Sequence, residues 1–545
     1  MRPLLLILIV CLLPLAATAE KRPNILFIIV DDLNDYLGSF GGHPQAHTPN
    51  IDRLAKMGAQ FTNAHTNVPV CAPSRSSLFT GVYPHSSRDF GWTKLREQYV
   101  LKHNKTFLEL LRENGYTLYG TGKILHNNIR KFWHEWGVTE RINYGPHAFD
   151  GNRITPHPNV PEPFRSINIV DGSFAPLSDV PQFPKARKTK HKPGWGYPTG
   201  SFRYVSETDR DLLPDEQHAI WAKKKLAELA QNESQHPFFM GIGFVRPHTP
   251  LYAPKRFFDM FPLDEIELPK IKKNDSNDTA FTDNYPMTQM GLHYYQALMD
   301  SYEDDEEGLK KVVQAYLACI AFMDEQLGIV LDALENSPLK DNTIIIFTSD
   351  HGWQFGEKNY LYKNSPWEES TRIPLLIAAP NLTKPNMKIE HPVSLIDIFP
   401  TIWELADLKG TYKMNAKAAD IGGASLVPLL TPSLWDRWKG AKGALTVMGA
   451  GIDKPIKDLA LTTNPHALWH VKVIKDLPLS YVWQQTYSYR TKDWRYIRYK
   501  DGQEELYHNR TDPYEWHNLA QDKKYTRQKN KLKKQMVNLI GVPLP

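Results

Sequence analysis

The chain has 545 residues, of which 41% are hydrophobic and 23% are charged. This composition is typical of a folded protein with a sizeable core, and it excludes a disordered chain. The net charge of +5 at pH 7 is small for this length and excludes a dedicated nucleic-acid binder, whose basic surface is stronger.

The N-terminus predicts a cleaved signal peptide over residues 1–19. Arg2 precedes an apolar run from Leu4 to Leu15, and Ala17-Thr18-Ala19 supplies the small residues of a cleavage site. The run is too short to span a membrane, so we expect no stable membrane insertion. A lipid anchor at Cys11 is disfavoured because Cys11 lies inside the run. We expect a secreted or periplasmic protein, and a lysosomal-type compartment also fits such a signal.

Predicted strands and helices alternate along most of the chain. Continuous apolar runs predict strands at residues 24–30, 116–123, 237–244, 342–352 and 373–380. Apolar residues at helical spacing predict helices at residues 48–58, 105–115, 215–231, 312–334 and 394–408. The first helix has Thr48 as its expected N-cap and Gly58 as its end. This alternation predicts an α/β sandwich with a large mixed, mostly parallel central sheet.

The pattern changes from about Ala441. Aromatic and polar residues alternate there, and Asp501-Gly502 is typical of a hairpin turn. We predict a main domain over residues 20–440 and a C-terminal subdomain over residues 441–545, with a small antiparallel sheet and a terminal helix at 525–541. Residues 145–215 are rich in proline, and we expect long irregular loops there.

Polar residues follow several predicted strands directly: Asp31, Asp32, Gly122, Lys123, Arg246, His248, Asp350 and His351. In such sheets, ligands bind just beyond the carboxyl ends of the strands. Three carboxylates and an imidazole, from Asp31-Asp32 and Asp350-His351, suit Ca²⁺ or Mg²⁺ better than zinc. An Asp-Asp pair alone would indicate an ordinary turn, but its combination with Asp350-His351 favours a metal site.

Two cysteines remain after the signal peptide. Cys319 lies in the predicted helix at residues 312–334 and is expected in the core. Cys71 begins a further predicted helix, where backbone N–H groups favour an anion, and Arg75 adds a positive charge one turn later. A lone cysteine is most often a buried structural residue. The spacing Cys-x-Pro-x-Arg, completed by Pro73, favours a functional cysteine.

With these residues, the sequence resembles the type I, formylglycine-dependent sulfatases of the alkaline-phosphatase superfamily. The resemblance covers nearly the whole chain through "NILFIIVDDL", "TPNIDRLA", "CAPSRSSLFTG", "ENGYTLYGTGKILH", "FTSDHGWQFGE" and "DPYEWHNLA". It is strongest to the iduronate-sulfatase branch through "GFVRPHTPLYAPKRF", "GKILH" and "DHGWQFGE". The resemblance implies an alkaline-phosphatase-like sandwich in which residues 20–440 form the catalytic domain.

The resemblance also implies a role for each matching residue. A maturation enzyme would oxidise Cys71 to formylglycine (3-oxoalanine). The metal ligands would be Asp31, Asp32, modified Cys71, Asp350 and His351, with Ca²⁺ preferred to Mg²⁺. His351 departs from many relatives, which carry Asn at that position. Arg75 and His126 would orient the formylglycine hydrate. Sulfate would be bound by Lys123, His248 and Lys363, with His248 or Lys363 donating a proton to the leaving alcohol.

The implied reaction is hydrolysis of a sulfate ester of a carbohydrate. One hydroxyl of the hydrated aldehyde would attack sulfur and displace the sugar alcohol, and the second would expel sulfate with help from His126. A phosphonate monoester or phosphodiester hydrolase of the same superfamily is the first alternative, and a catalytically silent carbohydrate-binding relative is the second. The sequence leaves open the sugar, the sulfate position, exo or endo action and the oligomeric state.

A basic cluster at residues 185–192 has two possible interpretations. It contains Lys185, Arg187, Lys188, Lys190 and Lys192, with aromatic residues on both sides. It could grip a polyanionic sugar, or it could be a solvated loop, and the sequence does not decide between them.

Overall fold

The computed structural model describes residues 22–138, 144–183, 191–198, 200–231, 236–449 and 472–542. The predicted signal peptide and residues 185–190 of the basic cluster lie outside these ranges. Within the part of the chain that is described, no helix is both long enough and apolar enough to cross a membrane.

A large sheet forms the centre of the molecule, as the sequence predicts. Strand β1 (Asn24–Val30) pairs in parallel with β12 (Phe238–Phe244) and β14 (Thr343–Ser349). Beyond β12 lie β3 (Thr117–Gly122) and β4 (Glu135–Trp136), both parallel. On the other side, β17 (Arg372–Ala378) runs antiparallel between β14 and β2 (Ala59–His65). Short strands β18 (Met387–Ile389) and β19 (Val393–Ser394) complete a mixed, mostly parallel sheet.

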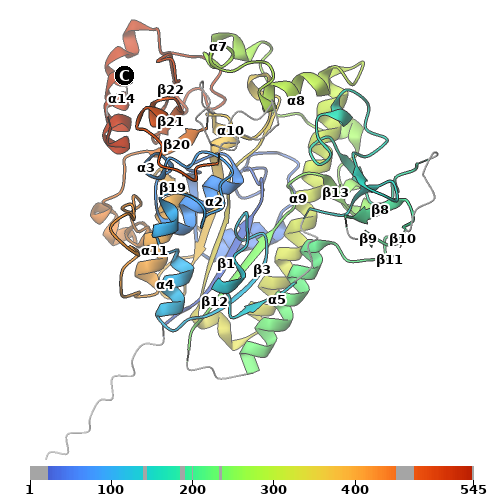
Figure 1. Ribbon diagram of the computed structural model, residues 1–545, viewed down its shortest axis with the longest axis horizontal. Coiled ribbons are helices and arrows are strands. Elements are labelled where there is room, and N and C mark those ends of the chain that lie inside the picture. Colours follow the sequence, from blue (N-terminus) through green and yellow to red (C-terminus); the bar gives the residue numbers. More distant parts are fainter. Residues whose placement is uncertain are drawn as a thin grey trace, which may run out of the picture.

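Helices cover both faces of this sheet (Figure 1). Leu26 and Ile28 of β1 face a core shared with α1 (Pro49–Met57), α5 (Pro214–Gln231) and α9 (Asp305–Glu335). Ile25 and Phe27 face a core shared with α2 (Cys71–Thr80), α4 (Phe107–Glu113) and α11 (Ile398–Leu405). Because both faces of the strand are buried, its sequence is apolar throughout rather than alternating.

Local contacts explain where individual helices begin. Thr106 and Glu109 form a reciprocal capping box at the start of α4. Thr48 occupies the N-cap position of α1, but its side chain does not cap the helix. Its hydroxyl instead accepts from the Gly38 N–H at 2.9 Å, so the predicted capping role is wrong. Cys319 is fully buried within α9, which confirms its place in the core.

The C-terminal region has its own antiparallel sheet. It is formed by β20 (Ala444–Met448), β21 (Thr486–Arg490), β22 (Arg495–Arg498) and β23 (Glu504–Tyr507), in that order. Asp501-Gly502 lies between β22 and β23, with Gly502 at φ 93°, as the predicted hairpin requires. The terminal helix α14 (Thr526–Ile540) packs on this sheet through Leu532 and Met536.

Residues 145–215 are more ordered than the sequence predicts. A four-stranded antiparallel sheet is formed by β6 (Ile154–Thr155), β5 (His147–Phe149), β8 (Gly194–Tyr197) and β9 (Gly200–Ser201). The prediction of purely irregular loops is therefore wrong, because strands of two to four residues are too short to show a periodic pattern.

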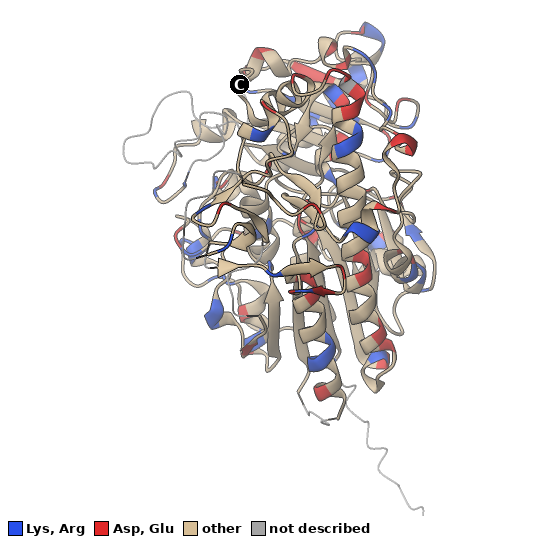
Figure 2. Ribbon diagram, turned by 90° about the vertical axis from the view of Figure 1, so that its right-hand side faces the viewer, with Lys and Arg blue, Asp and Glu red and all other residues tan. Residues whose placement is uncertain are grey.

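On the side of the molecule that Figure 2 presents, Lys and Arg alternate with Asp and Glu along the helices.

Candidate active site

The residues predicted at the strand ends lie together at one edge of the central sheet. Asp31 and Asp32 follow β1, Asp350 and His351 follow β14, and all four are fully buried. Lys123 follows β3 and is 1% exposed, and Cys71, also 1% exposed, begins α2. The backbone of Asp32 turns sharply, with φ 62°, and its N–H donates to Asp350 Oδ1 at 3.2 Å.

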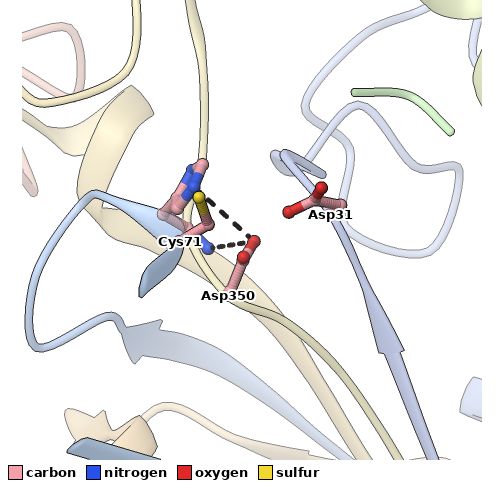
Figure 3. A group of neighbouring side chains, drawn as sticks. Asp31, Cys71 and Asp350 are labelled. Atoms are coloured by element: carbon pink, nitrogen blue, oxygen red, sulfur yellow. Dashed lines mark hydrogen bonds and ion pairs between the residues drawn. The ribbon is translucent and has the colours of Figure 1, made fainter. Parts of the chain in front are cut away.

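Two overlapping groups of side chains could hold a metal ion. The ligand atoms of Asp31, Cys71, Asp350 and His351 all lie within 4.8 Å of one another, and so do those of Asp31, Asp32 and His248. Figure 3 shows the side chains of Asp31, Cys71 and Asp350 directed into one space from three different elements. All the ligands predicted from the sequence are thus brought together.

The state of these side chains fits a bound cation. His351 Nε2 is buried without a hydrogen-bond partner and lies 3.2 Å from Asp32 Oδ1. The other ring nitrogen, Nδ1, lies 3.1 Å from the Gly352 carbonyl oxygen. The pKa of Asp32 is raised to about 8, because burial and the neighbouring charges of Asp31 and Asp350, which raise it, outweigh Lys363, which lowers it. Carboxylates crowded in this way, with an orphaned imidazole nitrogen beside them, suit a hard divalent cation.

Arg75 connects three of the converging elements. Its Nε donates to Asp350 Oδ2 at 2.8 Å and its Nη2 to Asp31 Oδ1 at 3.2 Å. Its Nη1 donates to the backbone carbonyls of Lys123 and Ile124. Arg75 is fully buried, and such a paired guanidinium holds its position rigidly. Arg75 is therefore a fixed positive charge between Asp31 and Asp350, one turn of α2 after Cys71.

Two lysines and a histidine complete the ring of polar groups. Lys123 Nζ pairs with Asp31, and Lys363 Nζ donates to both oxygens of Asp32 at 2.7 and 3.0 Å. Burial alone would lower the pKa of Lys363, but Asp32 and its neighbours raise it above its ordinary value. His248 Nε2 lies 3.9 Å from Asp31 Oδ2 and 3.8 Å from Asp32 Oδ2. Lys363 follows the short strand β16 (Leu361–Tyr362), which brings it to the site despite its distance in sequence.

His126 is the predicted residue that touches Cys71 directly. Its Nδ1 lies 3.3 Å from Cys71 Sγ. Burial and the positive charge of Lys123 lower the pKa of His126 to about 3, so its imidazole is neutral at ordinary pH. A neutral imidazole at this distance can accept a proton from a group at position 71.

Some supporting residues escaped the sequence analysis. Tyr144 lies against two site residues, with its ring 4.9 Å from Lys123 Nζ and 4.7 Å from the His248 ring centroid. It belongs to the loop region where no periodic signal was available. Ser74 donates to the Asp350 carbonyl at 2.7 Å, and its place inside the Cys-x-Pro-x-Arg motif could have drawn attention to it.

Comparisons with known proteins agree with this geometry. A family model described as Sulfatase matches residues 23–408. A sulfatase of Formosa agariphila is 34% identical over 95% of this chain and 89% of its own length. Iduronate 2-sulfatase of Mus musculus is 28% identical over 72% of this chain and 70% of its own length.

Solved structures share the fold. The phosphonate monoester hydrolase of Agrobacterium radiobacter superposes with a TM-score of 0.66 at 20% identity, covering 95% of this chain and 96% of its own. A protein solved in complex with its substrate D-glucosamine-2-N,6-O-disulfate gives a TM-score of 0.62 at 20% identity, covering 96% of this chain and 98% of its own.

Proposed function

The chain belongs to the sulfatase family and is a sulfuric ester hydrolase, and on that premise we propose that it is an exported enzyme that removes sulfate from a carbohydrate. Its substrate class would be a sulfated polysaccharide or a glycosaminoglycan-type oligosaccharide. The observation that carries the catalytic part of this proposal is the position of Cys71 at the start of α2, with His126 at 3.3 Å and Arg75 on the same helix.

The nucleophile in this proposal is derived from Cys71. Oxidised to formylglycine by a maturation enzyme, residue 71 would supply a hydrated aldehyde, and the thiol marks where its oxygen atoms would lie. His126 is placed to take a proton from that group, because its neutral ring has Nδ1 at 3.3 Å from Cys71 Sγ. The backbone N–H groups at the start of α2 add a favourable potential for a negatively charged oxygen.

A divalent cation fits the carboxylates beside Cys71. Asp31, Asp32, Asp350 and His351 would hold it, and we propose Ca²⁺ because the set is dominated by oxygen ligands. When bound, the cation would lower the pKa of a coordinated hydroxyl and offset charge on the sulfuryl oxygens.

The remaining polar groups would bind the sulfuryl group and the leaving alcohol. Lys123 and Lys363 are held protonated by Asp31 and Asp32, so both can offset negative charge on sulfuryl oxygens. Lys363 carries a proton to give, whereas burial lowers the pKa of His248 well below its ordinary value. We therefore assign proton donation to Lys363, with the N–H of neutral His248 as a hydrogen-bond donor to the substrate.

Two experiments test the proposal. Mass spectrometry of the peptide that contains Cys71 is expected to find the aldehyde, and a free thiol would contradict the assigned nucleophile. Release of inorganic sulfate from defined uronate-sulfate and hexosamine-sulfate oligosaccharides is expected to exceed hydrolysis of a phosphonate monoester. Preference for the phosphonate would favour the alternative function, which the shared fold of the phosphonate monoester hydrolase makes worth testing. The Cys71→Ala variant serves as the background for both substrates.

A further inference from the structure

The segment that presents Lys363 to the active site is held at both ends by the C-terminal region. We call residues 358–368 the Lys363 loop, because Lys363 lies midway along it. Within the loop, β16 pairs with β15 (Gln354–Phe355), which is part of the same stretch of chain. Helix α10 (Glu368–Thr371), which begins where the loop ends, lies beside the C-terminal sheet (Figure 1).

Glu515 contacts both ends of the Lys363 loop. It follows β23, in the closing segment "DPYEWHNLA", and is 1% exposed. At the start of the loop, the backbone carbonyl of Glu515 accepts a hydrogen bond from Lys358 Nζ. At the end of the loop, Glu515 Oε2 accepts from the Glu368 N–H at 3.1 Å. One buried residue thus joins two positions that lie on either side of Lys363.

Arg495 of β22 strengthens the contact at the end of the loop. Its Nε donates to Glu515 Oε1 at 2.5 Å, and its Nη1 donates to the Pro366 carbonyl at 3.1 Å. Its Nη2 pairs with the Glu368 carboxylate. Arg495 is fully buried, and a guanidinium that is paired in this way fixes the geometry of its partners. The side chain of Arg495 therefore ties Glu515 to the residues that follow Lys363.

The backbone of Glu515 has an unusual conformation. Its φ is 57°, in the left-handed region that residues other than glycine adopt only at a cost. Neighbouring contacts hold it there, since Oε1 also accepts from Asn509 Nδ2 at 2.8 Å and the N–H donates to the Asp512 carbonyl at 3.2 Å. In this conformation the carbonyl and the carboxylate of Glu515 both accept from the Lys363 loop. Such strain is typical of positions that serve a function.

The position of the Lys363 ammonium group matters for the reaction. Lys363 Nζ donates to both oxygens of Asp32, and the side chain is 1% exposed, so it has little freedom to adjust. The Tyr360 hydroxyl donates to the Lys363 carbonyl at 2.9 Å, which links the backbone of Lys363 to the first half of the loop. A displacement of about 1 Å in a group that acts on the substrate can cost about a hundredfold in rate.

We propose that Glu515 is a positioning residue of the reaction, which acts through the Lys363 loop to hold the Lys363 ammonium group against the sulfuryl group and the leaving oxygen. The inference rests on the proposed role of Lys363. None of the catalytic roles implied by the resemblance falls in "DPYEWHNLA", and these contacts give that segment a role.

The test is a double-mutant cycle in the full-length enzyme, with 4-nitrophenyl sulfate as the probe. Glu515→Gln keeps the shape of the side chain but removes the charge that faces Arg495, and we expect kcat/KM to fall by about tenfold or more. In a Lys363→Ala background the same change should alter kcat/KM by less than about twofold, because a residue that acts through Lys363 has nothing left to position.

The leaving group supplies a readout that a purely structural role would not change. Phenolate is a poorer leaving group than 4-nitrophenolate and depends more on a proton donor. The preference for 4-nitrophenyl sulfate over phenyl sulfate should therefore increase in Glu515→Gln, as it should in Lys363→Ala. Glu504→Gln, at a glutamate of the same sheet that pairs with Lys529 and Lys533, is the matched control and should leave both kcat/KM and the preference unchanged.

Lys358→Met carries the same test at the other end of the loop if Glu515→Gln does not fold. Its effect on kcat/KM should also disappear in the Lys363→Ala background. Equal effects of Glu515→Gln with and without Lys363, or an unchanged leaving-group preference, would overturn the positioning role while leaving the role of Lys363 intact. If Lys363→Ala itself keeps full activity, the proposed role of Lys363 is wrong, and the positioning role of Glu515 is wrong with it.

Discussion

Two clusters of charge lie near the same edge of the central sheet, and they differ in burial, since the active-site carboxylates are fully buried whereas Glu357 and Glu369 of the second cluster are partly exposed. In the active site, Arg75, Lys123 and Lys363 face the carboxylates of Asp31, Asp32 and Asp350. The second cluster is formed by Asp35, Glu357 and Glu369 in a cavity that we call the acidic cavity, where Arg372 pairs with Asp35. Further cations line the same cavity: Lys270, Lys358, Arg490, Lys492 and Arg510.

Buried charge is costly unless it is compensated by a partner, and the charges of the active site compensate one another. A divalent cation leaves the balanced active site positive, which suits an anionic ester.

Replacing Cys71 tests the nucleophile separately from the charged side chains around it. Cys71→Ala leaves every charge of the active site in place but removes the nucleophile, so we expect kcat/KM for a sulfate ester to fall at least about ten-thousandfold. Steady-state kinetics measures the loss, and Cys319→Ala, at the buried cysteine of α9, is the control that should stay active. Substantial activity in Cys71→Ala would show that another group attacks sulfur.

Removing Lys363 makes the active site resemble the acidic cavity. Without its ammonium group, Asp32 loses the partner that holds both of its oxygens. We expect Lys363→Ala to lower kcat/KM by roughly a hundredfold to a thousandfold, because a positive charge next to the sulfuryl group is lost. Lys363→Arg keeps the charge and should retain more activity. A fall of less than about tenfold in Lys363→Ala would remove Lys363 from the reaction.

Arg372 tests the balance of the acidic cavity. Arg372→Ala leaves Asp35 buried without its counter-charge, and we expect the free energy of unfolding in EDTA to fall by about 3 kcal/mol. Glu369→Gln removes one negative charge from the same cluster, so in EDTA its stability should be equal or higher. Urea unfolding measures both variants. Equal destabilisation by the two changes would contradict the idea that negative charge is in excess there.

Glu504 offers a third cluster, near the surface, where burial is weaker. Burial alone would raise its pKa, but hydrogen bonds from Lys529, Tyr496 and Lys533 lower it to about 2. A lowered carboxyl pKa stabilises the fold above the unfolded value and loses that effect as pH falls toward 2. After allowance for solvent screening, Glu504→Gln should cost about 1 kcal/mol near neutral pH.

The Glu504 effect is checked by chemical unfolding at two pH values. The difference between Glu504→Gln and the unmodified protein should shrink at about pH 3, since the carboxyl group then begins to take up its proton. Glu97→Gln, in an exposed pair with Lys94, should change stability little at either pH. A loss for Glu504→Gln that does not depend on pH would point to packing instead of charge.

Strong local signals made the sheet and the active site predictable. Buried strands such as β1 are long and wholly apolar, and the polar residues directly after them must lie at one edge of a parallel sheet. The motif at Cys71 implies roles for its neighbours through the resemblance. Lys363 was harder to place from local pattern alone, because the two-residue strand that presents it has no periodic signature.

Other features depend on contacts between distant segments, and no local sequence pattern predicts them. The small sheet in residues 145–215 is built from strands of a few residues, and Tyr144 reaches Lys123 only through that fold. The acidic cavity joins Asp35 with Glu357 and Glu369, more than three hundred positions later. Thr48 shows the reverse case, in which a good local signal for a helix cap was overridden by a contact with Gly38.

The burial of Cys71 bears on the order of its modification and of folding. Only 1% of this side chain is exposed, and it lies at the start of α2 beside Asp31, Asp350 and His351. We expect an enzyme that oxidises it to act before folding covers the sulfur. Any such modification would then belong to biosynthesis, and unmodified protein that is refolded in a test tube is expected to stay inactive.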